Sequence, residues 1–189
     1  MRVHGFSISS TGISAGFVYL IGGVLGGIVA GRVGDRVIRV RKDGRMLAAA
    51  LAALISAPLA YFGILQPAGA VAIALPLLAM AYGFFNMYYG FVYASIQDIV
   101  SPSLRGTTMA FYFMVMYLGG ASFGSLITGS LSDRMARQAA TAAGSPVITE
   151  AAKAIGLQQA MFILPVVAIA LALVLYAGSR TIVGDMRRV

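Results

Sequence analysis

Long apolar runs alternate with short polar segments along the chain, which is typical of a protein that crosses a membrane several times. A helix needs about 20 residues to cross the hydrocarbon core of a bilayer, and the sequence offers a run of that length five times. These predicted spans cover about residues 13–33, 46–65, 70–99, 104–131 and 157–176. The pattern therefore predicts an all-α, polytopic membrane protein, with a transmembrane helical bundle over residues 13–178.

The polar segments complete this plan. Residues 1–12 form a lead-in outside the cytoplasm, and residues 179–189 form a cytoplasmic tail. Residues 132–156 are the one sizeable loop, with a short surface helix expected around residues 149–154. The second span is rich in Ala and Leu and carries no polar stripe, so we expect it to face lipid.

The composition supports a membrane protein and narrows its partners. The chain is 59% hydrophobic and 11% charged, whereas soluble domains have about 25% charged residues. The net charge of +8 does not indicate nucleic acid, because the cations lie beside apolar runs, where they orient the helices and contact lipid headgroups. Membrane lipids are therefore an expected partner, and nucleic acid is not.

Chemistry-bearing residue types are scarce. The chain has no cysteine and a single histidine, which excludes disulfides, zinc-thiolate sites and thiol catalysis. The sequence contains no arrangement typical of a catalytic triad, a phosphate-binding loop or a metal cluster. We therefore expect no enzymatic activity, no metal and no cofactor.

The densest charge lies between the first two predicted spans. The alternation of spans places this basic segment, the turn at Arg105 and the tail on one side of the membrane. Ten of the 14 Lys and Arg residues lie on that side, and four lie on the other. Short cytoplasmic loops carry an excess of Lys and Arg. We therefore predict an integral protein of the plasma or inner membrane, with its amino terminus outside and its carboxyl terminus in the cytoplasm. The six cations of this basic segment are Arg32, Arg36, Arg39, Arg41, Lys42 and Arg45.

A polar stripe follows the third span. Its members are spaced by four, three, four and four residues, so they share one helix face. Polar groups within a bilayer favour a bundle interior or a watery cavity, which makes the stripe a candidate lining for a substrate cavity. Hydrogen bonding between helices, with tyrosines at the membrane interface, is the open alternative. The stripe comprises Tyr82, Asn86, Tyr89, Tyr93 and Gln97.

Two neighbouring spans could add to this lining. Tyr112 and Met116 form a weaker parallel stripe on the fourth span, and Tyr19 could contribute from the first. The first span also holds glycines four residues apart, such as Gly22 and Gly26. This spacing lets membrane helices approach closely, so we expect the first span to pack tightly on another helix.

Three strings, in order, resemble the major facilitator superfamily. The string Gly31…Gly34-Asp35-Arg36…Arg39 resembles its signature loop, Gly-x-x-x-Asp-Arg-x-Gly-Arg-Arg, although Ile38 replaces the second glycine and Val40 interrupts the basic run. Residues 98–110 resemble its turn between the tenth and eleventh helices, and residues 119–133 its glycine-rich eleventh helix. The order and spacing are similar to those in the carboxy-terminal half of a twelve-helix, spinster-like transporter.

The resemblance implies a function. The chain would supply helices eight to twelve, with the missing amino-terminal half of the carrier as its partner and one further helix absent. It would be part of a secondary active transporter that moves a small organic solute by alternating access. The alternative is a non-transporting membrane fragment with an interaction or regulatory role.

The resemblance also implies a latch on the cytoplasmic side. Asp35 would face the start of the fourth span near Arg105, and Arg36 or Arg39 would pair with Asp98. The alternative is that these charges only set the topology. The latch residues implied are Gly31, Asp35, Arg36, Arg39, Asp98 and Arg105.

Overall fold

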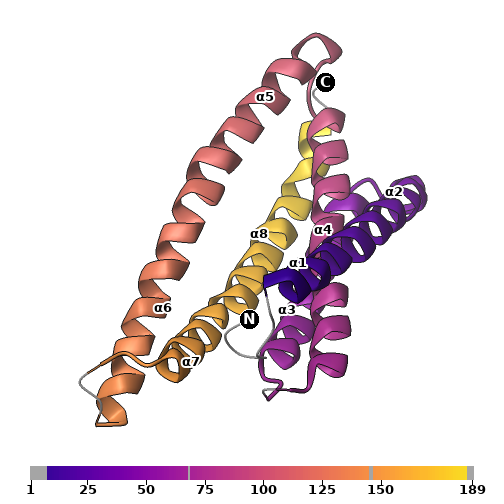
Figure 1. Ribbon diagram of the computed structural model, residues 1–189. Coiled ribbons are helices and arrows are strands. Elements are labelled where there is room, and N and C mark those ends of the chain that lie inside the picture. Colours follow the sequence, from indigo (N-terminus) through magenta and orange to yellow (C-terminus); the bar gives the residue numbers. More distant parts are fainter. Residues whose placement is uncertain (1–7, 68, 145–146, 187–189) are drawn as a thin grey trace.

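The computed structural model describes residues 8–67, 69–144 and 147–186 (Figure 1). Within these ranges all regular structure is helical. Five helical segments are long and apolar enough to cross a membrane, so the all-α, polytopic prediction is confirmed. They are Gly12–Val40, Gly44–Ile64, Val71–Asp98, Pro102–Ala142 and Glu150–Met186.

The first segment is longer than the sequence suggested. Its last part, predicted as a loop after residue 33, stays helical to Val40, and the chain turns only where Arg41 becomes extended. Residues 8–12 of the predicted lead-in are helical, and residues 1–7 lie outside the described residues. The segment comprises α1 (Ile8–Phe17), the π-helical turn η1 (Val18–Gly22) and α2 (Gly23–Val40).

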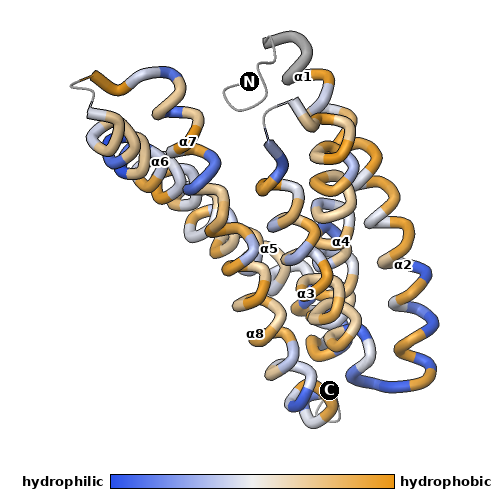
Figure 2. Tube along the Cα trace, turned by 90° about the horizontal axis from the view of Figure 1, so that it is seen from below, coloured by the Kyte–Doolittle hydropathy of each residue, from blue (hydrophilic) through white to orange (hydrophobic). Residues whose placement is uncertain are grey.

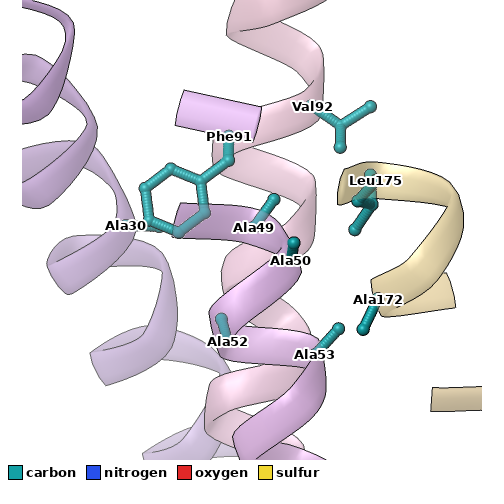
Figure 3. Packing of buried hydrophobic residues seen from close by; sticks show 9 residues of the cluster. All are labelled: Ala30, Ala49, Ala50, Ala52, Ala53, Phe91, Val92, Ala172 and Leu175. Carbon is teal, nitrogen blue, oxygen red and sulfur yellow. The ribbon is translucent and has the colours of Figure 1, made fainter. Parts of the chain in front are cut away.

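The second segment, α3 (Gly44–Ile64), packs one face at the centre of the bundle and exposes large apolar side chains such as Leu54 and Phe62 on the opposite face. Its alanines are small enough to let α2, α4 (Val71–Asp98) and α8 (Ile163–Met186) approach it closely (Figure 3). Leu51 is exposed on its outer side. The absence of a polar stripe thus reflected a closely packed face. The buried alanines of α3 are Ala49, Ala50, Ala52, Ala53 and Ala57.

The fourth segment forms an arm that stands apart from this core (Figure 1). None of its most apolar 18-residue stretch is buried within the described part of the chain. The arm runs past the predicted end at residue 131. It consists of η2 (Pro102–Leu104), α5 (Arg105–Val115), the π-helical turn η3 (Met116–Ala121) and α6 (Ser122–Ala142).

The predicted loop of residues 132–156 is mostly helix. α6 occupies its first part, and α7 (Glu150–Met161) begins where the Thr149 hydroxyl accepts a hydrogen bond from the Ala152 amide, at 3.2 Å. Gly156 lets α7 lie directly on α6, since a Cβ there would be 2.6 Å from the Ser132 carbonyl oxygen. After α7, α8 runs through to Met186, well into the predicted tail.

Candidate functional site

An aromatic cluster joins α4 to α5. The Tyr93 ring of α4 packs edge to face on Tyr112 and Phe113 of α5, with centroid distances of 5.5 and 5.2 Å. The Tyr88 and Tyr112 hydroxyls are hydrogen-bonded to each other. Such ring pairs contribute about 0.5–1.5 kcal/mol each beyond the area that they bury. The cluster therefore provides a specific connection between the arm and the core.

The cluster extends along α4 and into η3. The Tyr89 ring lies 5.4 Å from Tyr88 and 5.6 Å from Tyr93, and Phe113 lies 6.4 Å from Tyr117 in η3. Three of the predicted cavity residues, Tyr89, Tyr93 and Tyr112, are thus brought together. Met116, also predicted, is half-buried at the start of η3.

Sequence reasoning missed three members of this cluster: Tyr88, Phe113 and Tyr117. Tyr88 lies between two stripe positions, so the spacing that selected Asn86 and Tyr89 passed over it. Phe113 has no polar group and therefore gave no signal in an apolar run. Runs of adjacent aromatic residues, Tyr88-Tyr89 and Phe111-Tyr112-Phe113, were the hint that the aromatic surface is broader than one stripe.

The remaining predicted residues lie where α2 crosses α4. The Asn86 amide nitrogen donates a hydrogen bond to the Gly23 carbonyl oxygen at 2.9 Å. Tyr82 packs edge to face on Tyr19 of η1, with centroids 4.9 Å apart. The Asn86 contact matches the alternative of hydrogen bonding between helices, and its place in a substrate cavity stays a prediction.

Tyr82 also lines an apolar pocket of about 290 Å³ between α3, α4 and α8. Ser56, which lines the pocket, donates its hydroxyl hydrogen to the Ala53 carbonyl oxygen at 2.7 Å, so that polar group is already satisfied. The other lining side chains include Leu78, Phe85 and Leu164. The pocket offers a solute apolar surface and the Tyr82 ring.

A charged network lies at the end of the bundle that holds the turn between α2 and α3. Arg45, at the start of α3, places Nη1 2.5 Å from an Asp98 carboxylate oxygen at the end of α4. Its Nη2 is 3.4 Å from an Asp35 oxygen on α2. The Arg45 side chain is 15% exposed, whereas that of Asp35 is 71% exposed. The contact with Asp98 is therefore the stronger of the two, because it is shorter and better shielded from solvent.

The predicted pairing of Asp98 with Arg36 or Arg39 is corrected by this geometry. Among the described residues, the ion-pair partner of Asp98 is Arg45. On α2 it is Gly34 that lies against Phe91 of α4. Arg36 lies two positions further, about 200° around the helix, and is exposed.

Two other latch residues also differ from expectation. The ion-pair partner of Asp35 among the described residues is Arg45 on α3. The prediction was that Asp35 faces the start of the fourth span. Arg105 donates from Nε to the Val100 carbonyl oxygen at 3.4 Å, a local contact. A Cβ built on Gly31 would meet no described atom within 4 Å, so this motif glycine is not required here for close packing.

Asp43 in the turn is also matched by a cation. Arg41 Nη2 lies 2.8 Å from its carboxylate. The hydrogen bond from Arg41 holds the pKa of Asp43 below its ordinary value, so Asp43 is ionised at neutral pH. No group of three or more His, Cys, Asp or Glu side chains in the described ranges could hold a metal ion.

Comparison with known proteins identifies the family. A model of the Major Facilitator Superfamily matches residues 1–124, which confirms the resemblance seen in the sequence. An MFS-type efflux pump of Mycolicibacterium smegmatis is 30% identical over 142 residues, covering 71% of this chain and 31% of the pump. The chain thus spans about a third of the length of that curated relative. No solved structure matches the chain.

Proposed function

We propose, from the premise that the chain belongs to the Major Facilitator Superfamily, that it forms part of a secondary active transporter for a small organic solute. The observation that carries this proposal is the gathering of Tyr89 and Tyr93 of α4 with Tyr112 of α5 inside the apolar segments. Their rings and hydroxyls suit an organic solute, since they offer stacking surfaces and hydrogen-bonding groups without a fixed charge.

Alternating access requires a second bundle on the other side of the pathway. The unburied apolar arm of α5 and α6 supports a partner that covers it within the membrane. The relative, about three times as long as the matched region, has the length to contain such a partner. In this proposal the missing amino-terminal half of the carrier provides it.

The network around Arg45 has the role of the latch in this proposal. It joins the ends of α2, α3 and α4, so breaking or forming it would change how these ends move during transport. The excess of Lys and Arg at this end favours a cytoplasmic location. The amino terminus then lies outside and the carboxyl terminus in the cytoplasm, in the plasma or inner membrane.

Dye transport in proteoliposomes tests the function. The chain is reconstituted alone, and also co-expressed with the amino-terminal half of the efflux-pump relative, and movement of ethidium is followed by fluorescence. We expect transport only from the combination. Substituting Tyr93→Ala should lower it about three- to tenfold, in line with the loss of one or two ring contacts. The control Tyr61→Ala removes the same kind of ring from α3 and should leave transport unchanged. Tyr61 is 44% exposed.

Each other result contradicts a specific part of the proposal. Transport by the chain alone would show that no partner is required. Equal activity of the two tyrosine variants would remove the aromatic cluster from the pathway. No dye movement in either preparation would favour the non-transporting alternative.

A further inference from the structure

One face of α2 changes from apolar to basic along its length. Leu25, Val29, Arg32, Arg36 and Arg39 follow one another at steps of four, three, four and three residues. This spacing places all five on one side of the helix. Leu25 and Val29 are 56% and 40% exposed, and Arg32 and Arg36 are exposed as well.

The apolar half of this face borders a groove between α2 and α4. The two helices approach so closely at Gly26 that a Cβ there would overlap the Gly83 carbonyl oxygen. The larger side chains beside this crossing enclose a groove of about 180 Å³. Leu25 and Val29 form its α2 wall, and its α4 wall is formed by Met80, Phe84 and Met87.

The groove opens away from the proposed solute pathway. Met80, Phe84 and Met87 are offset by two residues from Tyr82, Asn86 and Tyr89, which is about 200° around α4. The groove therefore opens on a different side of α4 from the tyrosine stripe.

The basic half of the face lies where lipid headgroups are expected. The helical segment Gly12–Val40 has 29 residues and is about 43 Å long at 1.5 Å per residue. The hydrocarbon core is about 30 Å thick. The excess length leaves the last turns of α2, with Arg32 and Arg36, at the membrane surface. Figure 2 shows hydrophilic positions along the end of α2 that leads into α3.

These arginines are available to an external anion. Arg45 is matched by Asp35 and Asp98, and Arg41 by Asp43. Within the described ranges, Arg32 and Arg36 form no ion pair with a carboxylate of the chain. Exposed cations next to an apolar groove complement a ligand that carries a negative headgroup and an apolar chain.

We propose that an anionic phospholipid binds here, with an acyl chain in the groove between α2 and α4 and its phosphate on Arg32 and Arg36. Arginine suits this role because its planar guanidinium can donate two parallel hydrogen bonds to one phosphate. A lipid fits better than free phosphate, because the groove and the arginines lie on one continuous helix face. The site does not depend on the proposed transport function.

Native mass spectrometry of the full chain in detergent tests this site, with phosphatidylglycerol, phosphatidylcholine and glycerol 3-phosphate as probes. We expect phosphatidylglycerol to bind most tightly. The double variant Arg32→Gln/Arg36→Gln should weaken its binding about ten- to thirtyfold, given about 1 kcal/mol per arginine at a membrane surface. The matched control Arg134→Gln/Arg137→Gln removes two exposed arginines from α6 and should not weaken it.

A second variant addresses the groove itself. Val29→Trp fills the groove, keeps both arginines and should also weaken phosphatidylglycerol binding; circular dichroism checks that each variant is folded. Equal effects of the two arginine pairs would overturn the site. So would equal binding of phosphatidylcholine, undiminished binding to folded Val29→Trp, or displacement of the lipid by an equal concentration of glycerol 3-phosphate.

Discussion

At the scale of single residues, Arg45 has the largest structural role in the basic segment. It is the cation that contacts carboxylates on two other helices, Asp35 and Asp98. Arg45→Gln would leave both carboxylates without their cation, one of them partly buried. We expect this variant to lose about 1–3 kcal/mol of unfolding free energy, measured by circular dichroism during titration with denaturing detergent.

Arg36→Gln is the matched control for Arg45→Gln. It removes the same group from an exposed position on α2, where substitutions usually change stability by less than about 0.5 kcal/mol. Equal losses for the two variants would mean that Arg45 contributes only its net charge. A larger loss for Arg36→Gln would restore the pairing predicted from the sequence.

At the scale of elements, the crossing of α2 and α4 depends on which glycines face the partner helix. A side chain on Gly26 would overlap the backbone at Gly83, whereas Gly27 has open space around it within the described residues. Gly26→Val should therefore destabilise the chain by about 1–3 kcal/mol through overpacking. Gly27→Val should be close to neutral in the same unfolding measurement.

The comparison is well matched because both variants replace glycine with the same β-branched residue one position apart in α2. Any change in helix propensity is therefore common to both. If the two variants unfold at the same detergent fraction, the contact at Gly26 does not determine the crossing.

At the scale of the whole molecule, consecutive membrane-spanning segments run antiparallel. The turn at Lys42 and the turn after Ala142 therefore lie at opposite ends of the bundle (Figure 1). The chain has no cysteine, so single-cysteine variants can be labelled without background. We expect a membrane-impermeant maleimide applied to intact cells to label Ala142→Cys and not Lys42→Cys. Labelling after the cells are opened serves as the control for accessibility, and the reverse pattern would invert the proposed orientation.

The sequence by itself determined the class of protein and its family. A chain with so few charges and such long apolar runs must place helices in a bilayer, because only there are exposed apolar side chains and internally bonded backbone groups both stable. The three short strings were enough to identify the superfamily that the comparisons confirm. The helical period also placed Tyr89 and Tyr93 on one face of α4, where their rings are in contact.

Only the tertiary structure decided which partner each of these residues has. Periodicity shows which residues share a face of one helix, but it does not show which other helix meets that face. Arg45 belongs to the same basic segment as Arg36, and only the approach of α3 to α2 and α4 gives it Asp98. A helix face made of alanines can lie against lipid or against other helices. The alanine face of α3 is packed because α2, α4 and α8 approach it. Asn86 likewise contacts Gly23 because two glycine-lined helices cross at that level.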